Sequence, residues 1–361
     1  MALTVHNLAA TRAGYSARAY DRAIVIDALG GPGEFHPNAS STELLTAHAV
    51  ADARISGLTA VNLTVGAVGN GLHRFEQTVE GIAHADREIQ LHPDAFLKVL
   101  SAGDLRVAKS SQRLGLIYGF QDTSMLEGDL SRLDVFQGLG VRIVQATYNR
   151  RNLMGDGCVE AADGGLSQLG HELIAELNSR RLLLDLSHAG PRTIAEGIAA
   201  SKSPLAITHT GCRALADFPR NVSDVSLKAL ADKGGVVGIY FMCFLRNLEQ
   251  PHSEDVIRHL EHAVSVCGED HVGLGTDSSI SAMPIDDAFR SAHRKVITER
   301  IKAGISAAGE SPEVLNVIPE YNSPRRFLTL ADDLARRGWP SGRIEKILGS
   351  NFARLFGEIW R

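Results

Sequence analysis

The stretch Leu182–Thr210, LLLDLSHAGPRTIAEGIAASKSPLAITHT, contains two short apolar runs that each lead into a histidine. The first run, Leu182–Leu186, is followed by His188, and the second, Pro204–Thr208, is followed directly by His209. Both runs are almost continuously apolar, which is typical of a parallel strand that helices cover on both faces of the sheet. The stretch therefore predicts two buried parallel strands with polar side chains at their carboxyl ends.

Six further runs of the same kind recur along the chain, with helical segments between them. They are Ala23–Ala28, Thr59–Val65, Leu114–Phe120, Val141–Ala146, Gly235–Tyr240 and His271–Gly275. Helical periodicity and capping residues predict helices over Ser41–Gly57, Leu166–Arg181 (with Ser167 as N-cap), Ser223–Lys233 and Asp255–Val266. Eight strands that alternate with helices predict an α/β fold of the (β/α)8 TIM-like barrel type, with a doubly wound open sheet as the second choice.

The region beyond Ser278 is mostly helical in pattern, and we expect these extra C-terminal helices to pack on or across the mouth of the barrel. The sequence shows no internal repeat, low-complexity tract or obvious linker. Because α/β barrels reach this length as one unit, residues 1–361 are predicted to form a single (β/α)8 barrel domain.

Composition narrows the choice of partners. Of 361 residues, 44% are hydrophobic and 22% are charged, which supplies a large core and argues against disorder. The net charge is −5 with both signs scattered, so no basic stripe for nucleic acid is present. The four cysteines form no CxxC pair, and we expect reduced thiols. With no signal-peptide pattern and no apolar run of roughly 20 residues, we expect a cytoplasmic protein without a membrane partner.

Polar residues follow three of the predicted strands at the end where barrel active sites lie. Asp185 and His188 follow the fifth strand, His209 follows the sixth and Asp277 follows the eighth. In an eight-stranded α/β barrel, the carboxyl ends of the strands form the active-site face. Neutral imidazoles and a carboxylate suit zinc, with a water molecule in an open coordination position. The arrangement therefore favours a metal site over isolated packed histidines.

Matches to a known family are spread from about Ala23 to Phe356, and they include five motifs. They are GLSxxGxxLIxxLN at Gly165–Asn178, DLSH at Asp185–His188, ITHTGCRAL…RNVSD at Ile207–Asp224, VGLGTD at Val272–Asp277 and GSNFARLF at Gly349–Phe356. In order, spacing and coverage they resemble the renal (membrane) dipeptidase family, which are barrel metallohydrolases of the amidohydrolase superfamily. The resemblance implies a zinc enzyme that cleaves dipeptides, normally with two metal ions bridged by a glutamate.

The resemblance also implies roles for single residues. His188 and His209 match the two histidines of the family's second metal site, and Asp277 matches the aspartate that takes the proton from the attacking water. Arg220, in RNVSD, matches the arginine that holds the substrate's terminal carboxylate. A guanidinium suits that task because it is planar, permanently charged and able to form two parallel hydrogen bonds.

The chain departs from the family pattern at the first metal and at the bridge. The first strand should end in a His-x-Asp pair, but Leu29 and Gly31 stand at those two places and neither can ligate a metal. Gln121 stands where the bridging glutamate is expected, and a neutral amide is a poor zinc ligand. Tyr148 replaces the histidine that polarises the scissile carbonyl, although its hydroxyl can still donate a hydrogen bond there. These vacated ligand positions reduce the expected metal content to at most one zinc ion.

Local replacements for the missing ligands are less favoured. Glu34 and His36 lie just past the vacated pair, where they would need a loop that folds back. Asp122 follows Gln121 directly, so along a strand it is expected to point to the opposite face.

The polar loop Asn149–Gly157 follows the fourth strand and is placed to shape the pocket, with Asn149 as a predicted substrate contact. Arg150 and Arg151 in this loop are open to two interpretations. They either contact an anionic substrate or, more commonly for arginines in a loop, are solvated.

Three functions are compatible with these residues. The favoured one is a dipeptidase-like metallohydrolase that cleaves a dipeptide or a small carboxylate-bearing amide, with one zinc ion on His188 and His209 and Gln121 as a weak further ligand. One alternative is a metal-free barrel enzyme that uses the same histidines and Asp277 for acid/base chemistry. The other is a non-catalytic homologue that binds small carboxylates through Arg220. The expected partner is a small molecule with a free carboxylate, and a homodimer is compatible with the sequence.

Overall fold

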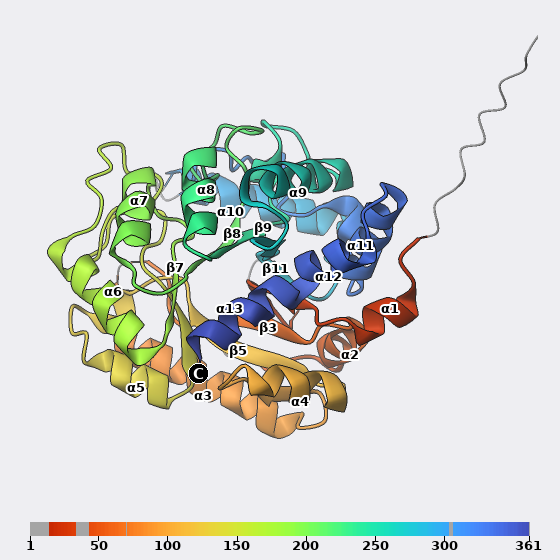
Figure 1. Cartoon of the computed structure of the whole chain (residues 1–361), viewed down its shortest axis with the longest axis horizontal. Helices are drawn as coiled ribbons and strands as arrows, with labels where there is room; N and C mark the ends of the chain where they lie inside the picture. Colours follow the sequence, from red (N-terminus) through yellow and green to blue (C-terminus); the bar gives the residue numbers. More distant parts are fainter. Residues whose placement is uncertain (1–13, 34–42, 70, 303–305, 361) are drawn as a thin grey trace, which may run out of the picture.

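The barrel is built from short, buried, parallel strands. In the computed structural model, which describes residues 14–33, 43–69, 71–302 and 306–360, eight strands follow one another in a parallel sheet (Figure 1). In sheet order they are β1 (Ile26–Asp27), β3 (Ala60–Thr64), β5 (Leu114–Phe120), β6 (Val141–Gln145), β7 (Leu183–Asp185), β8 (Ala206–Thr210), β9 (Val236–Ile239) and β10 (Val272–Leu274). Each coincides with one of the eight predicted runs, and the (β/α)8 prediction is confirmed.

Helices connect the strands and cover the outside of the barrel (Figure 1). They are α2 (Ala47–Ile55), α3 (Arg74–Leu91), α4 (Gly103–Ser111), α5 (Arg132–Gly138), α6 (Gln168–Arg180), α7 (Pro191–Ala200), α8 (Asp224–Asp232) and α9 (Ser253–Cys267), with α1 (Ala17–Arg22) ahead of β1. Ser167 caps α6 as predicted, because its hydroxyl oxygen accepts the backbone N–H of Gly170 at 3.0 Å. The helix expected from Ser41 begins only at Ala47 after a Thr46 cap, and residues 34–42 lie outside the described part.

Three short strands were not predicted. β4 (Phe96–Lys98) adds to the edge of β5, while β2 (Gly30–Gly31) and β11 (Ser278–Ser279) form a separate parallel ladder. Strands of two or three residues leave no periodicity to detect, and the glycines of β2 read as a tight turn.

The ends of the sheet meet through a buried carboxylate. β1 and β10 share no ladder, but Asp27 accepts the backbone N–H of Thr276 at 2.7 Å and its hydroxyl at 2.6 Å. Two backbone bonds support this contact: Ala28 N–H donates to Leu274 at 2.9 Å, and Asp277 N–H donates to Leu29 at 2.8 Å. The barrel is therefore closed at its carboxyl end by side-chain and backbone bonds around Asp27.

The amino-terminal end of the barrel is filled by the last helix. α13 (Asn351–Ile359) packs Phe352 and Phe356 against inward-facing strand residues, and the Phe356 ring stacks on Trp360 at 4.3 Å between centroids. These strand residues include Leu183 and Val236, which begin their strands. The expectation that the C-terminal helices cover the mouth is therefore wrong for α13, whose aromatic face packs on the residues that fill the amino-terminal end of the barrel.

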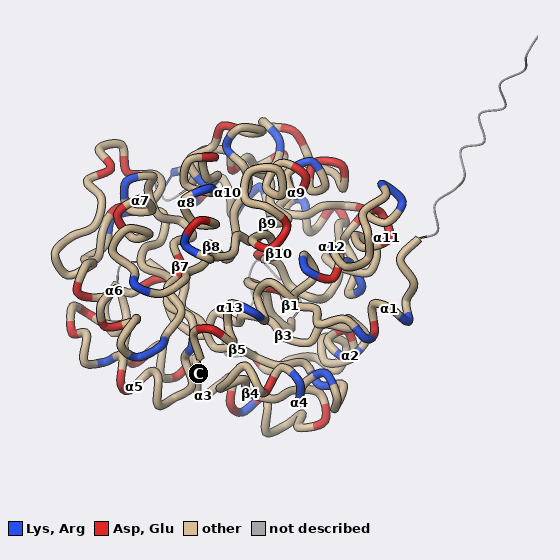
Figure 2. Tube along the Cα trace, viewed as in Figure 1, with Lys and Arg blue, Asp and Glu red and all other residues tan. Residues whose placement is uncertain are grey.

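The other C-terminal helices are α10 (Asp287–Lys302), α11 (Arg326–Arg336) and α12 (Ser341–Glu345). Of these, α10 carries Arg300 to a cavity at the barrel mouth, which it shares with Tyr148. Cationic and anionic residues are interspersed over the described chain (Figure 2), in keeping with the sequence-based argument against a nucleic-acid partner. Within the described part of the chain, none of the helices combines the length and apolar character that crossing a membrane requires.

Asp27 should make stability depend on pH in a definite direction. Burial raises its pKa from 3.8 to about 7, partly opposed by the bonds from Thr276. Between these values the unfolded chain releases the proton while the folded chain keeps it, so the free energy of unfolding falls as the pH rises from about 4 to about 7, by up to about 4 kcal/mol. Asp27→Asn should remove this component, which urea denaturation from pH 4 to pH 8 measures. Asp217→Asn, at an exposed position, is the matched control. Equal pH profiles for the wild type and Asp27→Asn would contradict the prediction.

Candidate functional site

Two histidines from neighbouring strands meet at the carboxyl end of the barrel. His188 follows β7 and His209 lies in β8, and their Nε2 atoms are 2.9 Å apart. Burial, followed by the nearby charge of Arg220, holds the pKa of both imidazoles well below the usual range. His188 also has a left-handed backbone with φ of 61°, a costly conformation that clusters at functional positions. The structure thus brings together the two predicted metal ligands in their neutral form.

Asp185 fixes the backbone beneath this pair. Its carboxylate accepts the backbone N–H and the hydroxyl of Ser187 at 2.9 and 2.7 Å, and the backbone N–H and the hydroxyl of Thr208 at 3.0 and 2.5 Å. Since Thr208 spends its single hydroxyl proton on Asp185, its oxygen accepts from His209 Nδ1, which lies 2.9 Å away. The Nδ1 of His209 is therefore the protonated nitrogen of that ring.

Asn149 has the same effect on the other histidine. Its amide oxygen lies 2.6 Å from His188 Nδ1, so this nitrogen is also a donor. With both Nδ1 atoms protonated, the Nε2 lone pairs of His188 and His209 face one another across 2.9 Å. Metal-binding histidines normally hold their second ring nitrogen on an oxygen acceptor in this way. The structure thus places Asn149 on a histidine, while its predicted contact with substrate stays a prediction.

The donor set fits one metal ion only in part. Among the residues that the structure describes, no three histidine, cysteine, aspartate or glutamate side chains gather closely enough to hold a metal. Gln121 directs its amide nitrogen to the hydroxyl of Thr64 at 2.8 Å, and its predicted role as a weak ligand gains no support from this bond. The histidine pair thus supplies two nitrogen donors for a single ion, and water would have to complete its coordination.

The vacated first-metal positions are filled by apolar groups. Leu29 is buried, and a Cβ added at Gly31 would lie 3.0 Å from Leu63 Cδ1, so a carboxylate there would displace that side chain. Glu34 and His36, the local replacements considered above, lie outside the described residues.

Asp122 was expected to point away from the site, but β5 ends at Phe120, so strand alternation does not apply to it. Its carboxylate lines a cavity next to Tyr148 and Asn149. The oxygens accept the backbone N–H groups of Gly69 and Thr123 at 2.8 and 2.7 Å. It therefore serves as a backbone anchor rather than as a member of a metal-binding group.

Arg220 is the cation of the site. The residue is only 3% exposed, its guanidinium lies 5.6 Å from the centre of the Tyr240 ring, and its Nη2 has no hydrogen-bond partner among the described residues. A buried guanidinium nitrogen without a partner costs free energy until an anion meets it. The geometry therefore suits the predicted binding of a substrate carboxylate.

Tyr148 and Asp277 flank the histidines. The Tyr148 ring stacks on His188 at 4.2 Å between centroids, and burial together with the charge of Asp277 raises its pKa to about 12. Asp277 has a left-handed φ of 55°, and burial raises the pKa of its carboxyl while Arg220 opposes the rise. Both residues thus lie within electrostatic reach of the predicted centre.

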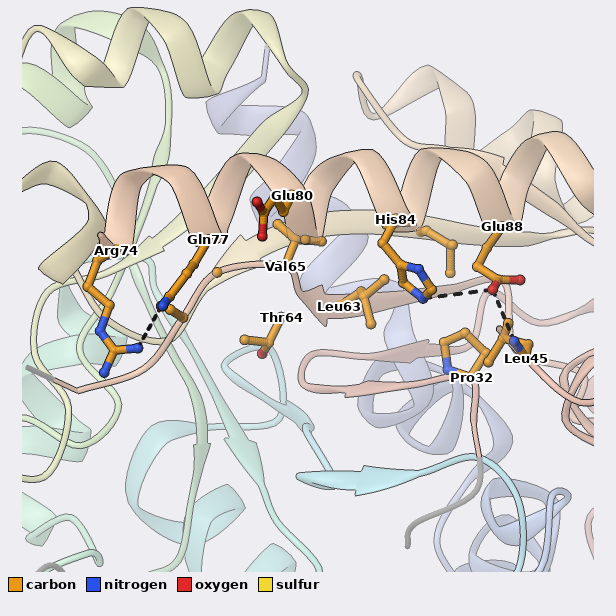
Figure 3. A pocket seen from close by; sticks show the side chains of 15 residues that line it. Pro32, Leu45, Leu63, Thr64, Val65, Arg74, Gln77, Glu80, His84 and Glu88 are labelled. Atoms are coloured by element: carbon orange, nitrogen blue, oxygen red, sulfur yellow. Dashed lines mark hydrogen bonds and ion pairs between the residues drawn. The ribbon is translucent and has the colours of Figure 1, made fainter. Parts of the chain in front are cut away.

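A cavity of about 660 Å³ lies between α3 and β3 and contains none of the predicted site residues (Figure 3). Polar side chains of α3, including Glu80 and His84, line it opposite Leu63 and Thr64. Thr64, which lines this cavity, also accepts a hydrogen bond from the amide of Gln121, the residue that stands where the family resemblance implies a bridging glutamate.

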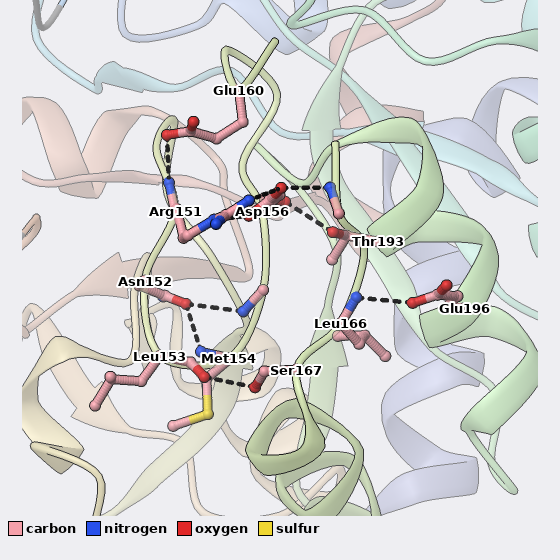
Figure 4. A network of polar contacts seen from close by, with 12 residues as sticks. Arg151, Asn152, Leu153, Met154, Asp156, Glu160, Leu166, Ser167, Thr193 and Glu196 are labelled. Atoms are coloured by element: carbon pink, nitrogen blue, oxygen red, sulfur yellow. Dashed lines mark hydrogen bonds and ion pairs between the residues drawn. The ribbon is translucent and has the colours of Figure 1, made fainter. Parts of the chain in front are cut away.

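A network of polar contacts holds the loop that follows Tyr148 and Asn149 (Figure 4). Asp156 accepts two guanidinium N–H groups of Arg151 and the backbone N–H of Gly164. The backbone oxygen of Asp156 accepts the Thr193 hydroxyl at 2.8 Å, which ties the loop to α7. Arg151 therefore has a structural partner, whereas Arg150 is exposed.

Two features of the site, the Asp185–Thr208 hydrogen bonds and the position of Arg300, were not predicted from the sequence. The pairing of Asp185 with Thr208 carries a signal, since a polar residue lies inside each apolar strand. Arg300 carries none, because it is one of several charged residues in α10.

Comparison with known proteins gives a consistent result. The model of the membrane dipeptidase family, peptidase family M19, matches residues 56–308. An uncharacterized Klebsiella pneumoniae protein in the pqqA 5′ region is 30% identical over 291 residues, which span 78% of this chain and 92% of that protein. Dipeptidase tcpJ of Claviceps purpurea is 27% identical over 289 residues, or 79% of this chain, which spans 60% of the fungal protein.

A solved structure shows the same relationship in three dimensions. An amidohydrolase from Pseudomonas aeruginosa superposes with a TM-score of 0.79 at 32% identity, and the match covers 95% of this chain and 98% of that one. Because the family match runs through most of the barrel, the chain belongs to the membrane dipeptidase family, peptidase family M19, and with it to the hydrolases, as its motifs predicted.

Proposed function

We propose that this chain is a dipeptidase-like hydrolase that cleaves a dipeptide, or a small amide with a free carboxylate, and uses at most one zinc ion held by His188 and His209. The observation that carries the proposal is the pair of Nε2 atoms 2.9 Å apart, with both Nδ1 atoms engaged as donors. Family membership and the name of the fungal relative support the reaction class. All these residues lie near the carboxyl end of one barrel, in keeping with the single domain predicted for residues 1–361.

The facing lone pairs require a positive charge between them. A shared proton is disfavoured because burial and the Arg220 charge lower the pKa of both histidines. A divalent cation is the other way to satisfy them, and neutral imidazoles are good zinc ligands. When bound, zinc would supply a water of lowered pKa and would polarise a carbonyl oxygen.

The remaining chemistry falls to three side chains. Arg220 would bind the substrate carboxylate and thereby orient the scissile amide. Asp277 would take the proton of the attacking water and pass it to the departing amine, a task that suits a carboxyl of raised pKa. Tyr148, which keeps its proton at neutral pH because its pKa is about 12, would donate a hydrogen bond to the oxygen that gains charge.

A second candidate rests on Asp185. Burial raises the pKa of this carboxyl, and a proton on it would reverse the hydrogen bonds through Thr208 to His209 Nδ1. His209 Nε2–H would then donate to His188 Nε2, and the hydrogen bonds that link Asp185, Thr208, His209 and His188 would be complete without a metal. This arrangement favours a metal-free acid/base enzyme or a non-catalytic carboxylate-binding homologue.

Metal content separates these functions. Protein purified without chelator should contain up to one zinc ion per chain by elemental analysis. His188→Ala and His209→Ala should each weaken zinc binding at least tenfold in calorimetric titrations, because each removes one of two protein donors. His48→Ala, whose side chain is 68% exposed on α2, is the matched control. Two zinc ions per chain would contradict the single site, and metal-free protein that binds but does not cleave dipeptides would favour the second candidate.

Arg220→Lys should raise the KM for dipeptides by about 10- to 100-fold and leave kcat within a fewfold of the wild type. Lysine keeps the charge but loses the two-pronged geometry that holds a carboxylate. Steady-state kinetics measure both constants, and Arg106→Lys at an exposed position of α4 is the control. An unchanged KM would remove Arg220 from substrate binding.

Asp277→Asn should lower kcat by about 10²- to 10⁴-fold, since asparagine has similar volume but cannot accept the proton of the water. Substrate affinity, measured by equilibrium binding, should stay close to that of the wild type. A variant with full kcat would show that the proton goes elsewhere.

A further inference from the structure

A cavity of about 500 Å³ opens beside the histidine pair. Tyr148 and Asn149 contribute to its wall, and both also contact His188: one stacks on the ring and the other accepts its Nδ1–H at 2.6 Å. Neither histidine lines the cavity, so a group bound there would lie across the Tyr148 and Asn149 side chains from the histidine pair. Arg220 does not line this cavity, so an anion bound there is a different one from the carboxylate that Arg220 is proposed to hold.

The wall of this cavity is rich in guanidinium groups. Four arginines line it, namely Arg74, Arg150, Arg151 and Arg300, against one acidic residue, Asp122. The Asp122 carboxylate is taken by backbone N–H groups and by the Asn152 amide at 2.8 Å, and no arginine is paired with it among the described residues. The Asp122 carboxylate therefore has uncharged hydrogen-bond donors as its partners and forms no ion pair with the arginines of the cavity among the described residues.

Two of the arginines form ion pairs with carboxylates that do not line the cavity. Arg151 pairs with Asp156, and Arg300 pairs with Glu310. Cationic side chains outnumber acidic ones on this wall by four to one. Arg150 is exposed and has no ion pair in the described part of the chain. A cavity of this charge favours an anionic over a neutral occupant.

Arg300 is preorganised for such a contact. Glu310 accepts its Nε and Nη2 at 2.9 and 3.0 Å, and the same carboxylate is fixed by the Ser306 hydroxyl at 2.9 Å and the Ala307 N–H at 3.2 Å. A guanidinium has five N–H groups, so this pair leaves donors free on its other edge. Tyr148 is close enough to Arg300 for the two side chains to interact. Glu310 thus fixes the Arg300 guanidinium and leaves some of its N–H groups available to a further acceptor.

The loop position of Arg150 is also fixed. Its neighbour Arg151 is anchored on Asp156, and the backbone N–H of Arg151 donates to Glu160 at 2.9 Å (Figure 4). Arg150 therefore projects from an ordered backbone between this cavity and a neighbouring one that it also lines.

We propose that this cavity is a second anion subsite, in which Arg300 and Arg150 bind the acidic side chain of the substrate residue that precedes the scissile bond. The substrate class is accordingly a dipeptide with a glutamate or aspartate side chain on its first residue, in addition to the carboxylate held by Arg220. This inference rests on the proposed function. It follows from an ordered guanidinium and an unpaired one on the wall of a cavity that adjoins the histidine pair.

The test compares two dipeptides of equal shape, Glu-Ala and Gln-Ala. Zinc-loaded wild type should show a kcat/KM at least tenfold higher for Glu-Ala, and chelator-treated protein should bind Glu-Ala at least tenfold more tightly by calorimetry. Arg300→Gln and Arg150→Gln should each reduce this preference to threefold or less, because each lowers kcat/KM for Glu-Ala more than kcat/KM for Gln-Ala. Arg106→Gln, with the same change of charge at an exposed site on α4, should keep the preference.

Each outcome bears on one of the two proposals. Equal treatment of Glu-Ala and Gln-Ala by the wild type overturns the subsite, and leaves the hydrolase proposal standing if both are cleaved. Selective binding of Glu-Ala without cleavage supports the subsite and counts against the hydrolase. A preference that appears only in the reversed pair, Ala-Glu over Ala-Gln, overturns the placement of the acid on the first residue. Arg150→Gln, which breaks no ion pair, keeps the test valid if Arg300→Gln unfolds the segment around Glu310.

Discussion

Two buried carboxylates, each bonded to a threonine of the next strand, hold the active end of this barrel together. Asp185 accepts the backbone N–H and the hydroxyl of Thr208 between β7 and β8, and Asp27 accepts the same two groups of Thr276 between β1 and β10. Burying a carboxylate is costly unless donors surround it, and here each has at least three. The residue after each threonine is a proposed functional group, so the bond that closes the strands also positions the chemistry.

The two carboxylate–threonine pairs are followed by different kinds of residue. Asp185 is followed on its own strand by His188, whose Nε2 meets His209, whereas Asp27 is followed by Leu29, which is buried and apolar. A side chain at position 31 would have to displace Leu63, whose Cδ1 would lie 3.0 Å from the Cβ of that side chain. The bonds that join the ends of the barrel are therefore kept next to the position where the family resemblance implies a first metal and where this chain has Leu29 and Gly31. These bonds need Asp27 and Thr276 and involve no metal ligand.

Sequence reasoning reached the frame of this protein but only part of its site. The eight strands were predictable because fully buried strands are continuously apolar, and His188 and His209 stood out because they follow such strands directly. The hydrogen bond of Asn149 to His188 was not predictable, since a loop residue could equally face the substrate. The position of Arg300 at the cavity could not be predicted, because it depends on where α10 packs against the mouth of the barrel. α13 was misplaced because an aromatic face does not say which end of the barrel it fills.

The replaced residues and the reduced number of metal ions that we expect agree in charge. Relative to the two-metal arrangement that the family resemblance implies, Gly31 and Gln121 each stand in place of a carboxylate, so the chain lacks two negative charges at the site. A zinc ion carries two positive charges. Loss of one ion together with those two carboxylates leaves the net charge of the centre unchanged, whereas loss of either alone would leave a buried imbalance, and buried unpaired charges are costly. Arg220, whose Nη2 lacks a partner among the described residues, is the remaining cation of the site, and its charge acts on Asp277. The carboxylate proposed for the substrate would give this guanidinium nitrogen an acceptor.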